Sequence, residues 1–404
     1  MRIFFIRSKA GCFWLAKSKK GMFPNSSSSI ELSRLALENN IDFLRKLVGP
    51  DVTISSVLKG NAYGHGIKHM VPELERLGIR HFSVFGSFEA LDVASFSTES
   101  STILIMGDIL DDHMPWMIEN DVECFVFNKI RLNALCKQAR LMKKKARIHL
   151  ELETGMNRTG INPSEWKEMA ALLQDYSDCI EVIGMCTHFA GAESVSNYKR
   201  ILNQKEIFSN GVAYFKGKGI NPTILHTSCS AGAIMYPENN LNMVRIGILQ
   251  YGLWPSQETQ VSYMREHKLT EDPLSRVISW RSHVMDIKTV KMGEFIGYGT
   301  SFLAEYDMRV ASVPVGYSYG FSRGLSNHGR VLINGHRLSV VGVVNMNMFL
   351  VEITHAEVNI GDKVTLIGND GDLSISVSHF SNLSEQLNYE LLTRLDKDIP
   401  RVVS

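Results

Sequence analysis

Eight short apolar runs, separated by segments with helical periodicity, constrain the fold of this chain more than any other feature. The runs are rich in β-branched residues, as buried strands are, and read TISSVL, HFSVF, TILIM, VECFVF, ARIHLEL, EVIGMC, PTILH and VRIGILQYG. Helical stretches lie between them, such as GIKHMVPELERLG, NKIRLNALCKQARLMKKK, PSEWKEMAALLQDY and residues 198–216. Strands that alternate with helices pair in parallel. Eight such units in roughly 220 residues predict a (β/α)8 barrel, with an open doubly wound sheet as the alternative.

The pattern changes at about residue 266. Beyond this point Gly, Asn and Asp turns separate the strands, in ISWRSHVMDIKTV, RVASVPV, GRVLINGHRLSVVGVVNMNMFLVEIT and GDKVTLIG, and helical periodicity returns only in SNLSEQLNYELLTRL. We therefore expect an α/β chain with two domains. We expect the barrel to occupy residues 30–265 and to begin with the helix ELSRLALENNIDFLRKL, and we expect a mainly β domain over residues 266–404.

Residues 1–29 stand apart from both domains. They carry six basic and no acidic residues, and they end in a run of serines. The apolar centre AGCFWLA is too short for a secretory signal. We expect a disordered basic tail, or residues upstream of a start at Met22, with a targeting peptide as the alternative.

Composition narrows the class of partner. The 43 basic and 42 acidic side chains give a net charge of +1, so nothing indicates binding to nucleic acid or to an anionic membrane. The six cysteines form no CxxC pair, which predicts reduced thiols in a cytoplasmic protein without a metal site or a disulfide framework. No apolar run is long enough to span a bilayer. We expect a small-molecule substrate.

Polar residues cluster at the carboxyl ends of the predicted strands, where barrel enzymes carry their active sites. They are Lys59, Arg158, His188, His226, Ser228, Ser230, Arg245 and Tyr251. Each has an ordinary structural explanation by itself, as a solvated lysine, a core histidine or an ion-paired arginine. Scattered structural residues have no reason to share one barrel face, so their joint position favours a site.

The stretch VLKGNAYGHG indicates which chemistry this site carries. Lys59 ends the first strand beside small residues, and a lysine in that setting can form a Schiff base with an aldehyde cofactor. Tyrosine and serine hydroxyls near glycines can hold a phosphate. The combination points to pyridoxal 5′-phosphate.

The sequence resembles the alanine racemases from about residue 30 to residue 401. Nine words in the same order carry the resemblance: VLKGNAYGHG, LETGMNRTG, GMCTHFAGAE, HTSCSAGA, MVRIGILQYGLWPS, IGYGTSF, PVGYSYGFSR, VVNMNMFLVEIT and NYELL followed by IPR. The resemblance implies a pyridoxal phosphate enzyme that interconverts L-alanine and D-alanine by a two-base mechanism and supplies D-alanine for peptidoglycan. It also implies a cytoplasmic homodimer with shared active sites.

The resemblance assigns the proton-transfer residues. Lys59 resembles the residue that anchors the cofactor and acts on the D face of the substrate, and Tyr298 resembles the base on the L face. A free tyrosine is a weak base at neutral pH, and His188, backed by Arg245, matches the group that assists it. Arg245 also matches the partner of the pyridine nitrogen, which it leaves unprotonated.

The binding residues follow from the same resemblance. Those that match phosphate ligands are Tyr63, Ser230, Tyr389 and the backbone at Gly247 and Ile248. Those that match substrate contacts are Arg158, which also touches the cofactor, the backbone of Met346, and Tyr317 and Asn347 on the substrate path. In the family Tyr298 and Met346 come from the second subunit.

Three positions depart from the family pattern. Glu151 stands where the family often has a carbamylated lysine, and we hypothesise that it orients Arg158. Asn347 replaces a usual aspartate at the substrate entrance, which puts exclusive use of alanine in doubt and keeps a broader racemase, for example one for serine, as an alternative. Tyr319 replaces a usual acid, with no derivable consequence.

Two other functions use the same fold. A barrel-type decarboxylase or D-amino acid lyase would need an acid for the pyridine nitrogen and a cysteine near the carboxyl terminus, whereas this chain has Arg245 and no cysteine after Cys229. A non-catalytic pyridoxal phosphate carrier is typically the barrel alone, so the second domain with Tyr298 argues against it.

Overall fold

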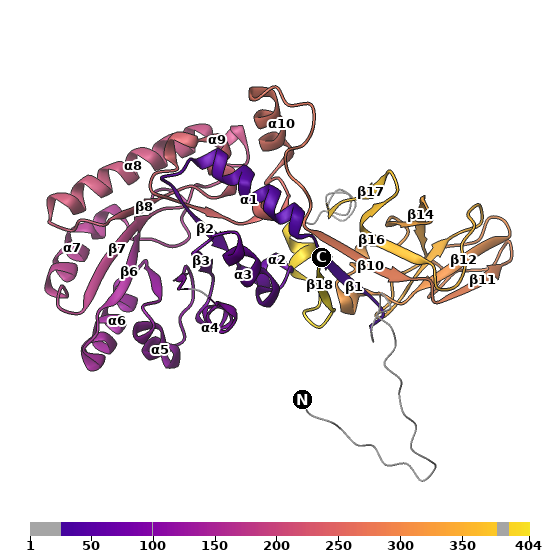
Figure 1. Ribbon diagram of the computed structural model, residues 1–404, viewed down its shortest axis with the longest axis horizontal. Coiled ribbons are helices and arrows are strands. Elements are labelled where there is room, and N and C mark those ends of the chain that lie inside the picture. Colours follow the sequence, from indigo (N-terminus) through magenta and orange to yellow (C-terminus); the bar gives the residue numbers. More distant parts are fainter. Residues whose placement is uncertain (1–25, 99, 378–387) are drawn as a thin grey trace, which may run out of the picture.

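Eight parallel strands form the barrel of this computed structural model, which describes residues 26–98, 100–377 and 388–404 (Figure 1). Their order around the barrel is β8-β7-β6-β5-β4-β3-β2-β9. The strands are β2 (Thr53–Val57), β3 (His81–Val84), β4 (Thr102–Ile105), β5 (Glu123–Val126), β6 (Ala146–Glu151), β7 (Ile180–Cys186), β8 (Ile224–His226) and β9 (Met243–Ile246). The predicted (β/α)8 fold is confirmed, because each strand overlaps one of the eight apolar runs.

The barrel closes through a loose junction between β8 and β9. Instead of a continuous ladder, a single bridge joins Cys229 to Arg245, and the Arg245 amide donates to the carbonyl of Ser228 over 2.9 Å. Asn242 completes the junction, since its side-chain oxygen accepts from the Leu225 amide at 3.0 Å. The junction fixes Arg245 at the seam.

Helices cover the outside of the strands (Figure 1). The helices are α3 (Ile67–Arg76), α4 (Ser87–Phe96), α5 (Met114–Glu119), α6 (Lys129–Met142), α7 (Trp166–Asp175), α8 (Tyr198–Gly217), α9 (Ser230–Met235) and α10 (Gln257–Glu266). Capping sets some of their starts, as where the Asn128 side chain accepts from the Arg131 amide. Strands β3 and β5 are buried on both faces, as parallel strands between helices are.

The start of the described chain differs from the prediction. Helix α1 spans Arg34–Val48 with Ser33 as its N-cap, and β1 (Ser29–Leu32) lies in the sheet of the second domain. The buried hydroxyl of Ser28 accepts a hydrogen bond from Trp280 at 3.2 Å. Residues 28–32 therefore contact the sheet of the second domain, although they precede the first helix of the predicted barrel. Residues 1–25 lie outside the described chain.

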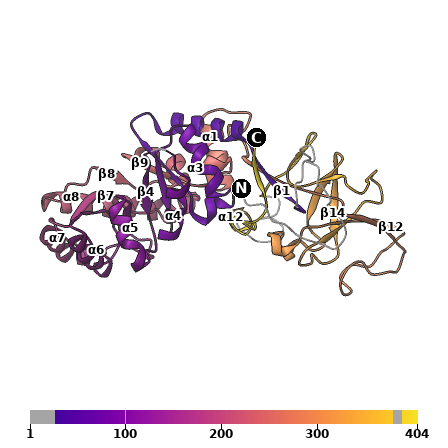
Figure 2. The ribbon, with the colours of Figure 1, turned by 60° about the horizontal axis from the view of Figure 1, so that its bottom comes forward.

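The second domain is built on a ten-stranded sheet. Besides β1 it contains β10 (Ile278–His283), β11 (Asp286–Val290), β12 (Met308–Val313), β13 (Arg330–Ile333), β14 (His336–Val341), β15 (Phe349–Glu352), β16 (Lys363–Asp370), β17 (Leu373–Ile375) and β18 (Arg401–Val403). Figure 2 shows that this domain extends away from the barrel, with α1 and α12 (Asn388–Thr393) near the junction. Residues 381–387 of the predicted last helix lie outside the described chain.

One prediction about cysteines is wrong. Cys136 on α6 and Cys179 just before β7 form a disulfide, whereas we expected only reduced thiols. Cys124, Cys186 and Cys229 are free. Across the described ranges, no helix combines the length and the apolar character needed to cross a membrane.

Candidate active site

Lys59 lies at the carboxyl end of β2 and starts a left-handed turn, α2 (Lys59–Tyr63). Gly60, Asn61, Ala62 and Tyr63 all have φ between 50° and 63°, and only the first of them is a glycine. Non-glycine residues adopt this conformation at a cost, and such strain concentrates at functional sites. The turn directs the Tyr63 ring against the backbone of Gly247.

Tyr63, Ser230 and Gly247 form a cradle of hydrogen-bond donors. The Gly247 amide donates to the hydroxyl of Ser230 at 3.0 Å, and a Cβ atom at residue 247 would collide with the Tyr63 hydroxyl. Ile248 begins the short turn η5 (Ile248–Tyr251), so its amide has no partner inside that turn. Because Gly247 has no side chain, the Tyr63 hydroxyl can approach its backbone closely, and this gathering of donors suits a phosphate.

Tyr389 on α12 completes the cradle from the end of the chain. Its ring lies edge-on to that of Tyr63, with the centroids 6.0 Å apart, and its hydroxyl donates to the Pro255 carbonyl at 3.3 Å. Burial raises the pKa of both phenols well above the usual value. Both hydroxyls therefore stay protonated and can donate to an anion.

The Lys59 amine is tuned toward its neutral form. In a single chain the Lys59 side chain is exposed to solvent. Desolvation by the surrounding protein is the main influence that lowers the pKa of its ammonium group, and the positive charge of Arg158 lowers this pKa further. Arg158 is exposed on the loop after β6. A lysine with a lowered pKa is a better nucleophile toward an aldehyde and a better proton acceptor at neutral pH.

Arg245 is buried and is held by neutral acceptors. Its Nη1 donates to Nδ1 of His226, and its Nη2 donates to the Thr187 carbonyl at 2.8 Å and approaches Nδ1 of His188 at 3.4 Å. No carboxylate among the described residues forms an ion pair with it. Because an arginine cannot readily give up its proton, it can only donate to a neighbouring group.

Two buried histidines connect Arg245 to Glu123 on β5. His149 Nε2 lies 2.8 Å from the carboxylate of Glu123, and His149 Nδ1 lies 2.8 Å from Nε2 of His226. Burial raises the pKa of Glu123, but hydrogen bonds from His149 and Arg147, together with the His81 ring 3.6 Å away, outweigh it and lower this pKa well below the usual value. Burial lowers the pKa of both histidines.

These contacts determine which nitrogen atom carries the proton in each histidine of this chain of hydrogen bonds. Ionised Glu123 can only accept, so neutral His149 carries its proton on Nε2 and accepts on Nδ1. His226 must then carry its proton on Nε2 and accept from Arg245 on Nδ1. A carboxylate at one end and a guanidinium at the other thus fix both tautomers.

His188 is a neutral imidazole with one free donor. Burial, and then the charges of Arg245 and Arg158, lower its pKa to about 3. Since Arg245 donates toward Nδ1, the proton of His188 is on Nε2. A neutral imidazole with an Nε2–H group can donate to a phenolate oxygen within hydrogen-bonding distance.

The remaining predicted residues gather on the second domain. Tyr317 lies beside Asn345, which accepts from its amide at 3.1 Å, and Ser318 donates to the carbonyl of Met346 at 2.8 Å and accepts from Asn347 at 3.1 Å. The loop that holds Tyr298 runs between β11 and β12, at the end of the molecule away from the barrel (Figure 1). A single chain therefore brings the Lys59 group together, whereas Tyr298 lies on a loop of the second domain.

These side chains are unusually exposed for their type. Tyr298 is 74% and Met346 is 55% exposed, and Tyr317 and Phe295 are also exposed. Monomeric proteins rarely leave such a group of large apolar side chains uncovered.

The other two positions that depart from the family pattern, besides Asn347, are Glu151 and Tyr319. Glu151 is buried, and burial raises the pKa of its carboxyl, although Thr159 hydrogen-bonds to it. Within the described chain no ion pair joins it to Arg158, but the charges of Arg245 and Arg158 act against the effect of burial on this pKa, and orientation of Arg158 by Glu151 stays a hypothesis. Tyr319 packs on the core, and its carbonyl accepts from the Asp396 amide at 3.4 Å.

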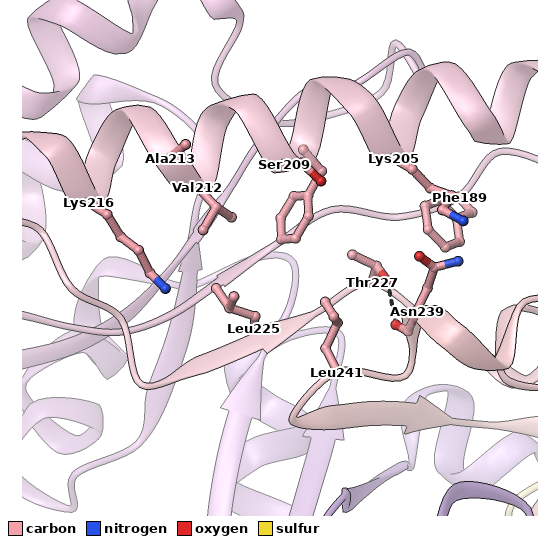
Figure 3. A pocket seen from close by; sticks show the side chains of 11 residues that line it. Phe189, Lys205, Ser209, Val212, Ala213, Lys216, Leu225, Thr227, Asn239 and Leu241 are labelled. Atoms are coloured by element: carbon pink, nitrogen blue, oxygen red, sulfur yellow. Dashed lines mark hydrogen bonds between the residues drawn. The ribbon is translucent and has the colours of Figure 1, made fainter.

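A separate pocket lies outside this site (Figure 3). It has a volume of about 340 Å³ and lies between α8 and β8, with Phe208, Val212 and Leu225 in its apolar lining. Lys216 points into it, and Thr227 hydrogen-bonds to Asn239 at its inner edge. None of the predicted site residues lines it.

Sequence reasoning missed four residues that shape the site: Glu123, His149, Glu89 and Arg401. Glu123 and His149 had a signal, because each interrupts an otherwise apolar strand, VECFVF or ARIHLEL. Glu89 gave no comparable signal, since a charged residue on a helix is ordinarily solvated, and Arg401 ends the IPR motif, which carried the family resemblance but indicated no role for this residue.

Comparison with known proteins agrees with this geometry. The family model "Alanine racemase, N-terminal domain" matches residues 32–255, and "Alanine racemase, C-terminal domain" matches residues 277–403. An alanine racemase of Leptospira interrogans is 35% identical over 381 residues, which cover 93% of this chain and 96% of that protein.

Solved structures agree as well. The alanine racemase of Bacillus anthracis with bound L-Ala-P is 31% identical with a TM-score of 0.85, and 94% of this chain and 95% of that one are covered. The alanine racemase of Bartonella henselae with covalently bound pyridoxal phosphate shares the fold, with 24% identity, a TM-score of 0.79 and coverage of 94% and 100%. The chain belongs to the alanine racemase family.

Proposed function

We propose that this protein is an alanine racemase that binds pyridoxal 5′-phosphate at the mouth of its barrel. The observation that carries the proposal is the convergence of Lys59 with a cradle of protonated donors, Tyr63, Ser230 and Gly247, beside the buried Arg245. When bound, pyridoxal phosphate supplies a conjugated ring that draws electrons from the α-carbon of an amino acid. Lys59 holds the cofactor covalently, and the cradle with Tyr389 and Ile248 holds its phosphate.

Arg245 donates a hydrogen bond to the ring nitrogen and leaves it unprotonated. The chain of hydrogen bonds from Arg245 through His226 and His149 to Glu123, called the histidine relay below, supports this role. It orients the guanidinium through His226 without placing a carboxylate beside it. A ring with an unprotonated nitrogen withdraws electrons less strongly, which disfavours side reactions such as transamination.

Lys59 and Tyr298 move the α-proton on opposite faces of the substrate. Lys59 serves the D face, where its lowered pKa favours the neutral amine. Tyr298 serves the L face and needs help, since a phenol has an ordinary pKa near 10. His188 gives that help by donating from Nε2 to the phenolate oxygen.

Tyr298 and Met346 reach the site from a second subunit. Their position on the domain away from the barrel and their exposure support a homodimer with shared active sites. Arg158, the Met346 backbone and Tyr317 bind the substrate carboxylate or line its path.

A broader amino acid racemase is the second candidate, and Asn347 favours it. Its neutral amide, held by Ser318, stands where a carboxylate is usual and repels a polar or acidic substrate less. Racemisation rates for a panel of L-amino acids, with serine and alanine compared directly, distinguish the two candidates.

Mixed dimers test the main proposal. Lys59→Ala and Tyr298→Phe are each expected to abolish or nearly abolish racemisation of L-alanine. Refolded together, half of the dimers are mixed and each contains one intact site, so about a quarter of the wild-type activity should return. If the mixture stays inactive, the shared site is wrong, and if borohydride does not fix pyridoxal phosphate on Lys59, the cofactor assignment is wrong.

We further propose that the enzyme acts in the cytoplasm and supplies D-alanine for peptidoglycan. Growth of a bacterial strain that requires D-alanine, after expression of this chain, tests the supply. Lys59→Ala is the matched control and should not restore growth.

A further inference from the structure

The left-handed turn after Lys59 is held at both ends by buried charged side chains. We propose that Glu89 and Arg401 are positioning residues that clamp this turn in its cofactor-binding shape. The inference rests on the proposed function, since it takes the cofactor to be pyridoxal phosphate. It adds two residues, from α4 and from β18, that touch neither cofactor nor substrate.

Glu89 holds the start of the turn. Its carboxylate is 6% exposed, and one oxygen accepts from the Gly60 amide at 2.7 Å while the other accepts from the Phe85 amide at 2.9 Å. No ion pair to Glu89 is found in the described chain. Both oxygens are thus used to join the loop after β2 to the loop after β3.

Arg401 holds the end of the turn. Its side chain is buried, and Nε and Nη2 donate to the carbonyl of Gly64 at 3.0 and 2.9 Å. The other donors reach the carbonyls of Asp396, Lys397 and Ile399, and no carboxylate in the described chain forms an ion pair with it. A buried guanidinium without a counter-ion is costly, so its geometry is unusual for a purely structural residue.

The two charges match the ends that they hold. A helical turn leaves N–H groups free at its start and carbonyl groups free at its end, so an anion suits the start and a cation suits the end. Gly64 also packs directly on α12, where a Cβ atom would overlap the carbonyl of Leu392. The clamp therefore fixes Tyr63 on the turn relative to Tyr389 on α12.

Four substitutions test the clamp. Glu89→Gln and Arg401→Met remove its two charges, and Asp92→Asn and Arg394→Met are controls, because Asp92 is an exposed residue of α4 and Arg394 forms a surface ion pair with Glu390. The apo-protein is titrated with pyridoxal phosphate, and amide hydrogen exchange is measured for residues 58–67. Loss of either clamp residue should raise Kd about tenfold or more and speed exchange, whereas the controls should not.

A rescue variant separates positioning from general stability. Ala62 is held at φ 55°, which glycine adopts without strain, so Ala62→Gly should leave the wild-type Kd nearly unchanged but restore much of the affinity of Arg401→Met. Unchanged Kd and exchange in both clamp variants overturn the proposal. An affinity loss also overturns the proposal if it is proportional to the fall in apo-protein Tm and is not recovered by Ala62→Gly.

The outcome is separable from that of the proposed function. If the wild-type chain fails to bind pyridoxal phosphate, the proposed function fails, and hydrogen exchange at residues 58–67 still decides the clamp. If Arg401→Met does not fold, Glu89→Gln with Ala62→Gly carries the same test from the other end of the turn.

Discussion

Gly247→Ala tests the phosphate cradle most directly. The added Cβ atom would collide with the Tyr63 hydroxyl and lie 2.9 Å from Cζ of that ring, where ordinary contacts begin near 3.4 Å. The ring cannot move freely, since Tyr251 and Tyr389 pack against it at centroid distances of 5.6 and 6.0 Å. The tyrosine must therefore withdraw its hydroxyl from the phosphate position.

The expected loss can be estimated from that hydroxyl. A hydrogen bond to a charged group contributes about 1.5–3 kcal/mol, so Kd for pyridoxal phosphate should rise about 10- to 150-fold. Titration of the apo-protein measures this change. Gly217→Ala is the matched control, because nothing lies within 4 Å of a Cβ atom at that position.

A double variant shows whether the hydroxyl is responsible. Tyr63→Phe removes both the hydroxyl and the worst of the collision, so adding Gly247→Ala to it should cost much less than adding Gly247→Ala to the wild type. Fully additive losses, or a Gly247→Ala variant that binds the cofactor as the wild type does, would refute the assignment of Tyr63 to the cradle.

Three further predictions concern a carboxyl group, a histidine and a disulfide that do not themselves form the phosphate cradle. Glu123→Gln removes the charge that fixes the tautomers of His149 and His226, and it leaves Arg147 without its partner. We expect the unfolding free energy to fall by about 3 kcal/mol and kcat to fall as well. If neither value changes, the histidine relay is contradicted. Burial lowers the pKa of His65 to about 4, so between pH 6.5 and pH 4 the unfolded chain binds a proton that the folded chain does not. The unfolding free energy should therefore fall by about 3 kcal/mol as the pH falls through that range. Urea unfolding measures this pH dependence, and His65→Phe should flatten it. Cys136→Ser should lower the unfolding free energy of the oxidised protein by about 4 kcal/mol, from the loop of 43 residues that the disulfide closes, and an equal midpoint with and without reductant would show that the disulfide does not form.

The barrel could be predicted because its signals are local. Each strand is a short β-branched run, and the rule that active sites gather at strand ends needs only the order of the runs. β1 could not be predicted in the same way, since its register pairs Ser29 with Arg281 and Ile30 with Arg401. A four-residue strand carries too little pattern to reveal partners that lie so far along the chain.

The site could be predicted in its chemistry but not in its supports. Lys59 and Tyr63 both stand in the single motif VLKGNAYGHG. The φ values of Asn61 and Ala62, however, are imposed by contacts with α4, α12 and β18. The acid in β5 and the histidine in β6 are also visible as polar breaks in apolar runs. Their connection to Arg245 depends on the order of the strands in the barrel, which brings side chains of β5, β6, β8 and β9 together although β7 lies between β6 and β8.

The second domain contributes to two different sites in the proposed dimer. Its last segment, with Tyr389 and Arg401, packs on the Lys59 turn of the same chain. Tyr298 and Met346, which lie on the exposed side of that domain, would serve the partner. Cofactor binding should therefore survive dissociation of the subunits, whereas racemisation should not, because each monomer keeps its complete phosphate cradle but loses its second base. Dilution that lowers activity while the cofactor stays on Lys59 is the expected result, and parallel loss of both would place part of the cofactor site in the partner as well.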